Sequence, residues 1–162
     1  MDKIIVNEKY LHSAITGKIL QGFYTVVGDL VNNLELEIYK RALVIELTNL
    51  GLTCEADKNL IVTYKGISVG TYKIDILVDK SVIIKLAAKE KLTTEDEIEI
   101  TNYLKLSDIE VGLLLNFCQE GEHKRKVFTN NIKNRLSSEN NLKSEINEKP
   151  TNVGEQNKKQ KK

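Results

Sequence analysis

The sequence has few of the residues that most often build metal sites or disulfide frameworks. It contains two cysteines, Cys54 and Cys118, which are far apart, and two histidines, His12 and His123. No CxxC pair or Cys/His cluster exists, so a zinc site is not expected. Isolated cysteines are typical of free thiols, and free thiols indicate a reducing compartment. We therefore expect a cytoplasmic protein.

Long apolar runs and prolines are also scarce. No segment approaches the roughly 20 apolar residues that a membrane-spanning helix requires. The first residues, MDKIIVNEKYLH, include acidic residues and lack a small-residue cleavage site, so no signal peptide is expected. Tryptophan is missing, and Pro150 is the single proline. With 41% apolar and 29% charged residues in 162, the chain is expected to form one globular domain with a tail.

Basic charge is scarce over most of the chain and concentrated at its end. Residues 1–120 contain 13 Lys or Arg and 18 Asp or Glu, whereas residues 121–162 contain 11 and 5. The folded part is therefore expected to be mildly acidic and the tail basic. Nonspecific binding to phosphates needs clustered basic side chains, so an acidic body argues against it. The lysine-rich end could still contact nucleic acid or another acidic surface weakly.

Hydrophobic spacing predicts three helices. The first two are expected over residues 15–31 and 34–50, and Gly51 is expected to end the second. A third is expected to begin with Thr94 as its N-cap, because acidic residues fill the turn that follows. Three glycines weaken the first helix, since each costs about 1 kcal/mol relative to alanine: Gly17, Gly22 and Gly28.

Strands are predicted from alternating or continuous apolar runs. They fall at about 52–62 (one strand or two short ones), 67–78, 82–88, 111–118 and around Val127. The order of elements predicts an α/β fold in which helices cover a mixed β-sheet. From residue 131 the chain is polar with few apolar residues, which predicts a disordered basic tail over 131–162 after a domain at 1–130.

Two charged residues interrupt neighbouring apolar strands. Asp75 lies in the strand 67–78 and Lys85 in the strand 82–88. A three-residue loop at 79–81 would pair Val78 with Val82 and place Asp75 opposite Lys85 on one face of the sheet. Opposite residues have Cβ atoms about 5 Å apart, so the register predicts an ion pair. The alternative is that each charge is simply an exposed strand residue.

Five stretches, taken in order, resemble one protein family. They are FYTVVGDL, LELEIYKRAL, VTYKGISVGTYKIDILVDKSVIIKLAAKEKL, EIEITNYLKL and VGLLLNF. They look like the GxxExxY family, small proteins with the PD-(D/E)XK nuclease-like fold, and the similarity extends roughly from Ile15 to Phe128. The resemblance implies a restriction-endonuclease-like core. It also implies a nuclease site in which carboxylates hold Mg²⁺ or Mn²⁺ beside a lysine, because such a metal polarises a phosphodiester and activates water.

The residues that the family pattern would place in that site are mostly substituted. The GxxExxY motif reads NLELEIY, so only Tyr39 remains and Leu36 occupies the glutamate position. The strand aspartate is retained as Asp75. The Glu-x-Lys of the next strand becomes Lys85-Leu-Ala87, which puts a lysine at a metal-ligand position and an alanine at the position of the catalytic lysine.

On the following helix, the family's glutamine becomes Glu99, with the tyrosine retained as Tyr103. Their spacing of four puts both on one helix face. We hypothesise that the ammonium of Lys85 stands where the metal would be and neutralises Asp75, and Glu99 as well. A fixed positive charge there opposes Mg²⁺. The hypothesis therefore predicts no metal cofactor and no catalytic residue.

Three functions remain open on the sequence. The first is a catalytically inactive nuclease-like domain kept as a binding or regulatory module; a protein partner or a homodimer fits its acidic body at least as well as nucleic acid. The second is an active divalent-metal nuclease with relocated residues. In that case Asp75 and Glu99 would bind Mg²⁺ or Mn²⁺, and the other groups would come from four candidates: Glu35, Glu37, Lys85 and Lys89.

The third function is that of an interaction protein whose basic tail matters most. Leu136, Leu142 and Ile146 have the loose spacing of a short helix that could form on a partner, and the chain ends in the lysine-rich GEQNKKQKK. The simpler interpretation is a tail that only keeps the protein in solution. The sequence does not separate these possibilities.

Overall fold

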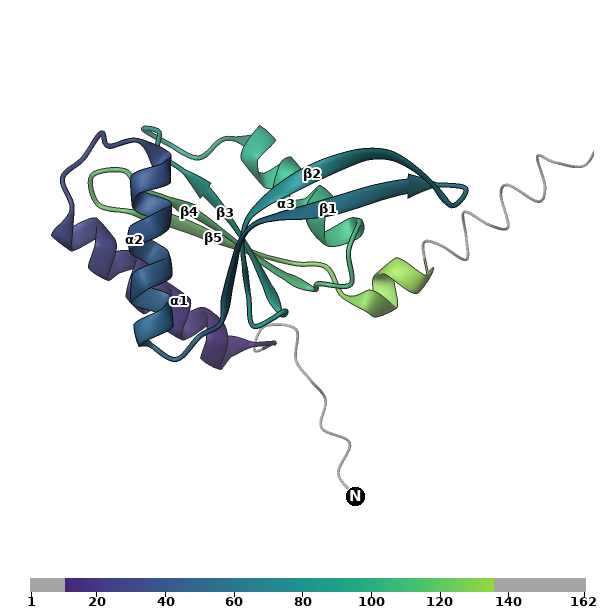
Figure 1. Cartoon of the computed structure of the whole chain (residues 1–162), viewed down its shortest axis with the longest axis horizontal. Coiled ribbons are helices and arrows are strands. Elements are labelled where there is room, and N and C mark those ends of the chain that lie inside the picture. The colour runs from purple at the N-terminus through teal and green to yellow at the C-terminus, as the bar shows by residue number, and fades with distance from the viewer. Residues whose placement is uncertain (1–10, 136–162) are drawn as a thin grey trace, which may run out of the picture. The chain divides into compact units, whose positions relative to one another are not determined.

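The computed structural model describes residues 11–135 (Figure 1). The chain divides into a first unit, Met1–Asn130, and a second, Asn131–Lys162. The elements of the first unit are, in order, α1 (Ser13–Asp29), α2 (Leu36–Asn49), β1 (Cys54–Tyr64), β2 (Ile67–Val78), β3 (Val82–Ala87), α3 (Thr94–Lys105), β4 (Val111–Asn116) and β5 (Glu122–Val127).

The strands form one mixed sheet in the order β1-β2-β3-β4-β5. β3 and β4 are parallel and are joined through α3, whereas the other neighbouring pairs are antiparallel. A parallel pair requires a crossover connection of this kind, and here the helix supplies it. The α/β class and the mixed sheet flanked by helices are therefore confirmed.

The helices α1 and α2 cover one face of the sheet. Their apolar stripes, which include Phe23 and Leu43, pack on the inward side chains of the strands. The main members of this core from the sheet are Ile76, Val78, Val82, Ile84, Leu86, Val111, Leu113 and Leu115. Burial of these side chains stabilises the fold by about 25 cal/mol per Å² of apolar surface removed from water.

The helix α3 covers the opposite face. Tyr103 and Leu104 pack against Leu77 and Ile83, and a second cluster joins Ile100 to the sheet. The helix comes very close to β4, because a Cβ atom at Gly112 would lie only 2.7 Å from Ile100 Cδ1. Glycine at this point of β4 therefore sets the distance between the helix and the sheet.

The helix α3 begins one residue earlier than the sequence predicted. Its N-cap is Thr93, not Thr94. The Thr93 hydroxyl accepts the N–H of Asp96, and the Asp96 carboxylate accepts the N–H of Thr93, which makes a reciprocal capping box. Glu97 lies at the corresponding position for Thr94, but it pairs with Lys124 and Lys126 of β5 instead.

The predicted register of β2 and β3 is confirmed over three pairs, Val78↔Val82, Leu77↔Ile83 and Ile76↔Ile84. β1 runs two residues further than predicted and forms one continuous strand paired with β2. Lys65 and Gly66 connect these strands, with φ of 50° and 78°. Positive φ at both central residues is the geometry of a tight type I′ hairpin turn.

The described part of the second unit, residues 131–135, is helical. The remainder of the predicted tail, including Leu136, Leu142 and Ile146, lies outside the described residues, so its predicted disorder stays a prediction. Within residues 11–135, no helix is long and apolar enough to cross a membrane. Cys54 and Cys118 are free thiols, each half-buried.

Candidate functional site

Asp75 and Lys85 both interact with residues of α3. Lys85 pairs with Glu99 of that helix, and Asp75 interacts electrostatically with Glu99 and Tyr103 of the same helix. The side-chain alternation of β2 is interrupted at Asp75, because Ile74 and Leu77 both pack under α3. That both charges face one side therefore stays a prediction. α3 completes the site by bringing further polar side chains over them.

The predicted ion pair between Asp75 and Lys85 is wrong in its contact. The backbone pairing of β2 with β3 ends at Ile76↔Ile84, and the next contact is made by a side chain instead. Asp75 Oδ2 accepts the backbone N–H of Leu86 at 2.8 Å. The Asp75 carboxylate thus takes the place of a backbone acceptor where the ladder ends, and no Asp75 oxygen lies within 4 Å of the Lys85 ammonium among the ion pairs of the described residues.

The ammonium of Lys85 contacts Glu99 instead. Lys85 Nζ lies 2.9 Å from Glu99 Oε2, and the Lys85 side chain is only 15% exposed. The hydroxyl of Tyr103 donates a short hydrogen bond to the other carboxylate oxygen, Glu99 Oε1. As the spacing of four predicted, both helix residues lie on one face. Glu99 is thus held between an ammonium and a phenol.

The three acidic groups titrate differently. Burial raises the pKa of Asp75, although the Leu86 N–H and the charges of Lys85 and Lys40 oppose that rise. Burial also acts to raise the pKa of Glu99, but the Tyr103 hydroxyl and Lys85 together hold it below its usual value. Burial and the Glu99 carboxylate raise the pKa of Tyr103. At neutral pH, Glu99 is the more firmly ionised of the two carboxylates.

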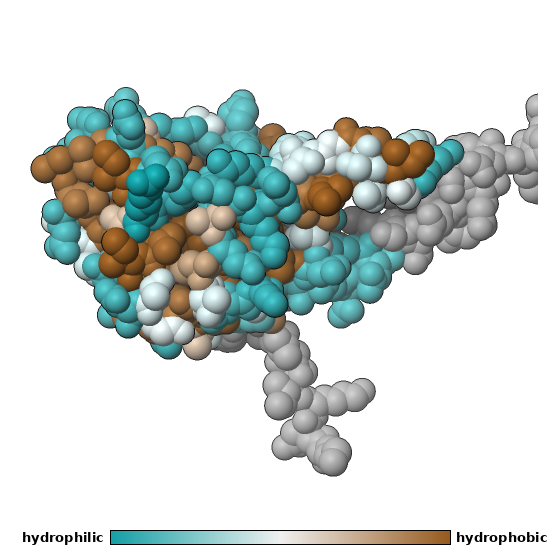
Figure 2. Space-filling model, in the orientation of Figure 1, coloured by the Kyte–Doolittle hydropathy of each residue, from teal (hydrophilic) through white to brown (hydrophobic). Residues whose placement is uncertain are grey.

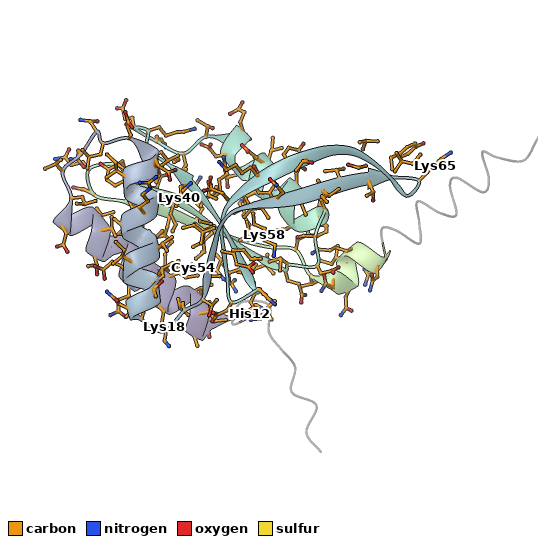
Figure 3. The ribbon with its side chains drawn as sticks, in the orientation of Figure 1. His12, Lys18, Lys40, Cys54, Lys58 and Lys65 are labelled. Carbon is orange, nitrogen blue, oxygen red and sulfur yellow. The ribbon has the colours of Figure 1, made fainter. Side chains whose placement is uncertain are left out.

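Lys40 approaches from the other side of the sheet. It extends from α2 (Figure 3), and its side chain is 8% exposed. Its Nζ lies 2.6 Å from Asp57 Oδ1 and 2.7 Å from Glu37 Oε2. Asp57 is level with Asp75 across β1 and β2, but its φ of 55° interrupts the pairing there. Lys73 Nζ lies 3.2 Å from the same Asp57 oxygen.

The sequence analysis missed Lys40 and Asp57. A signal for Lys40 exists in the helix pattern, because it lies three residues before the buried Leu43 and shares its apolar face. A lysine on a buried stripe requires a partner. Two groups of ion pairs, one around Lys40 and one between Lys85 and Glu99, act electrostatically on Asp75 through Lys40, Lys85 and Glu99. We call these groups together with Asp75 the charged cluster: Glu37, Lys40, Asp57, Lys73, Asp75, Lys85 and Glu99.

The two apolar substitutions of the family pattern lie outside these ion pairs. Leu36 is the first residue of α2 and is 36% exposed. Ala87 is buried and packs with Leu92, Ile100 and Leu114 beneath α3. The position where the family pattern has its lysine is therefore part of an apolar contact in this chain, and a lysine there would bury an unpaired ammonium.

The residues considered for relocated chemistry are occupied elsewhere. Glu37 pairs with Lys40 and Arg41, both on its own helix. Lys89 is exposed, and its Nζ contacts both carboxylate oxygens of Asp96 at 2.9 and 2.8 Å. That pair ties the end of β3 to the capping box of α3. Glu35 is the N-cap of α2 and makes no side-chain capping bond.

These donors suit a divalent cation poorly. Mg²⁺ and Mn²⁺ bind carboxylate and other oxygen ligands, and an ammonium between two carboxylates repels the metal while using the same oxygens. Among residues 11–135, no group of three or more His, Cys, Asp or Glu side chains is arranged to hold a metal ion. Instead, the lysines of the cluster neutralise its carboxylates.

Comparison with known proteins gives the following matches. A family model described as "PD-(D/E)XK nuclease superfamily" matches residues 13–128. Among solved structures, the crystal structure of an alkaline exonuclease (LHK-Exo) from Laribacter hongkongensis is similar, with 16% sequence identity and a TM-score of 0.38. That alignment covers 91% of this chain and 84% of the exonuclease chain. No curated protein matches.

Proposed function

The chain belongs to the PD-(D/E)XK nuclease superfamily, and we propose that it is a member without nuclease activity, kept as a binding or regulatory module. The observation that carries this proposal is the ammonium of Lys85. It lies 2.9 Å from Glu99, and its charge opposes the rise in the pKa of Asp75 that burial causes. Those two carboxylates are the ones that an active nuclease with relocated residues would need for its metal.

The physical argument is electrostatic. Two carboxylates held close together repel each other unless a cation neutralises them, and a nuclease uses Mg²⁺ for that purpose. Here the ammonium of Lys85 is paired with Glu99, and one oxygen of Asp75 accepts the N–H of Leu86. A divalent ion would have to displace the ammonium of Lys85, which is covalently attached to the chain. Without the divalent ion, the phosphodiester chemistry that it supplies would be lost.

The burial of Ala87 supports the same proposal. Its methyl group packs with Ile100 and Leu114, so the position of the family's catalytic lysine now contributes to the core. The two lysines considered as replacements are engaged elsewhere, since Lys89 is held by Asp96 and Lys85 by Glu99. We therefore propose that the fold was retained while the nuclease activity was lost. We propose the cytoplasm as its compartment, which the free thiols support.

Calorimetric titration of Mg²⁺ and Mn²⁺ tests this function directly. The parent protein is expected to give no binding heat and to leave a supercoiled plasmid intact. The Lys85→Glu substitution removes the ammonium and adds a third carboxylate beside Asp75 and Glu99. It is expected to gain metal binding that the parent lacks, because three carboxylates then converge without an internal cation.

The control for net charge is Lys18→Glu, which makes the same charge reversal on the exposed side of α1. It should gain no metal binding. Micromolar metal binding by the parent, abolished by Asp75→Ala and accompanied by plasmid nicking, would establish the active-nuclease alternative instead. Binding that appears equally in both charge reversals would show that Lys85 is not at the inherited metal position.

A further inference from the structure

The hairpin of β1 and β2 extends well past the ends of β3, β4 and β5 (Figure 1). β2 pairs with β3 only over Ile76–Val78, so the nine residues before Ile76 have β1 as their partner strand. This outer part of the hairpin is a two-stranded ribbon with two open edges. A two-stranded ribbon is marginally stable by itself in water, so a further partner would stabilise it.

The hairpin exposes large apolar side chains near its end. Figure 2 shows them gathered there, next to the polar turn. Their exposed fractions are between 41% and 69%, which is far above that of core residues. The residues are Ile61, Tyr64, Ile67, Val69 and Tyr72. An apolar group of this kind on a projecting element is typical of an interaction surface.

The outer half of the β1 edge has few of the features that normally prevent strand pairing. The charged residues of β1, Glu55, Asp57 and Lys58, precede this half, and the register shift beside Val62 places its extra residue, Val69, in β2 and not in β1. The segment NLIVTY, Asn59–Tyr64, contains no charge and no proline. The edge strand at the other side of the sheet, β5, reads EHKRKV, with four charged residues among six. Charged edge strands resist pairing with another chain, whereas long uncharged ones favour it. Of the two edge strands, β1 is therefore the one better suited to pair with a further strand.

From this geometry we propose that β1 pairs antiparallel with β1 of a second copy, about a two-fold axis at Ile61. An uncharged segment is compatible with its own copy, since no like charges face each other. Antiparallel pairing also brings the end of one hairpin, with Lys65, to the base of the other, with Glu55 and Asp57. Figure 3 shows Lys65 at the end of the hairpin and Lys58 nearer its base.

The hairpin is less suited to nucleic acid. It contains three lysines, but Lys58 is bound to Glu55 at 2.8 Å and Lys73 to Asp57 at 3.2 Å. Lys65 lies over the ring of Tyr64 and is the one lysine of the hairpin without a carboxylate within 4 Å among the described residues. Phosphate binding requires several cations that are free to replace counterions. The dimer does not depend on whether the charged cluster cleaves nucleic acid.

Sedimentation equilibrium of the full chain measures this assembly. The parent is expected to form a dimer, and Ile61→Lys is expected to weaken it by about tenfold or more, because two ammonium groups would then face each other across the axis. The matched control is Ile45→Lys on α2. Ile45 is 61% exposed and Ile61 is 60% exposed, so the control makes the same change at equal exposure. It should leave the dimer unchanged.

A second experiment locates the axis. Ile61→Cys is expected to form a disulfide-linked dimer on mild oxidation, whereas Ile45→Cys and the parent, with its own Cys54 and Cys118, are not. A parent that stays monomeric at every concentration would overturn the proposal, as would a dimer that is insensitive to Ile61→Lys. Duplex DNA binding that is lost in Ile61→Lys without any change of mass would assign the hairpin to nucleic acid instead.

Discussion

At the scale of single residues, the charges in buried strands have a structural explanation. Asp75 takes the N–H of Leu86 where the β2–β3 ladder ends, and Lys85 neutralises Glu99 beside it. Burying a carboxylate costs much less free energy when it accepts a strong hydrogen bond and lies near a cation than when it is isolated. The contacts of the charged cluster therefore stabilise the fold whether or not the cluster takes part in any chemistry.

Replacing Lys85 should show how much the cluster depends on its ammonium. Lys85→Met keeps the length of the side chain and removes the charge, so Glu99 loses a partner and Asp75 loses a favourable neighbour. Since Glu99 is 43% exposed, the free energy of unfolding should fall by about 1–2 kcal/mol at pH 7, less than for a fully buried pair. Urea unfolding at that pH measures the loss.

The pH dependence follows from the direction of the pKa shift. The folded-state pKa of Glu99 lies below its ordinary value of 4.5, so its pairing stabilises the protein above that pH and is lost as pH falls through the lower folded pKa. The difference between parent and Lys85→Met should therefore shrink toward pH 3. Adding Glu99→Gln to Lys85→Met should recover part of the loss at pH 7. A difference unchanged by pH would contradict the role of Lys85.

The site could be predicted from sequence only in part. The loop length set the register of β2 and β3, which the structure confirms over three pairs, and helical spacing placed Tyr103 with Glu99. Alternation does not say where two strands separate, and their separation at Asp75 turned the predicted ion pair into a backbone contact. Lys40 was missed because its partner, Asp57, lies 17 residues away on another element.

At the scale of elements, the contact of α1 with α2 depends on one glycine. A Cβ atom at Gly22 would lie 2.8 Å from Leu47 Cδ2, so the side chain of Leu47, which is fully buried, would have to shift within the core. At Gly17, five residues earlier, a Cβ atom would meet nothing within 4 Å. The sequence suggested that the glycines of α1 only weaken the helix. The structure shows that Gly22 lets the helices approach.

These glycines give opposite predictions for the same substitution. Gly17→Ala should raise the free energy of unfolding by up to about 1 kcal/mol, the gain in helix propensity. Gly22→Ala gains the same propensity but forces Leu47 out of place, so it should lower stability by about 1–3 kcal/mol. Thermal and urea unfolding measure both. If Gly22→Ala proved as stabilising as Gly17→Ala, the close approach of α1 to α2 would be refuted.

The order of elements was predictable because each apolar pattern is long and clearly helical or extended. The five strands and three helices listed above follow the predicted sequence, and the parallel β3–β4 pair follows from the helix between them. The projection of the β1–β2 hairpin was not predictable. The length of β2 can be predicted from its residues. How much of β2 is paired with β3 cannot, because it depends on the pairing of β3 ending at Ile84.

At the scale of the whole molecule, charge is divided between the two units. Residues 131–162 contain 8 Lys or Arg and 4 Asp or Glu, so the chain without them has a formal net charge of −3 instead of +1. The apolar clusters under both sheet faces lie within the first unit. We therefore expect the second unit to contribute to the electrostatics of the protein through its net charge of +4.

A chain that ends at Asn130 separates these contributions. Its thermal unfolding midpoint should stay within about 2 °C of the parent, because a loss of 1 kcal/mol would lower it by roughly 3 °C for a domain of this size. Its retention on heparin at low salt should fall to that of an acidic protein, since the cations able to release counterions are concentrated in the part removed. A midpoint lowered by several degrees would mean that the second unit packs on the first. Unchanged heparin retention would place the cationic surface within residues 1–130, and the acidic body would then have to contain a basic face strong enough to bind polyanions without the tail.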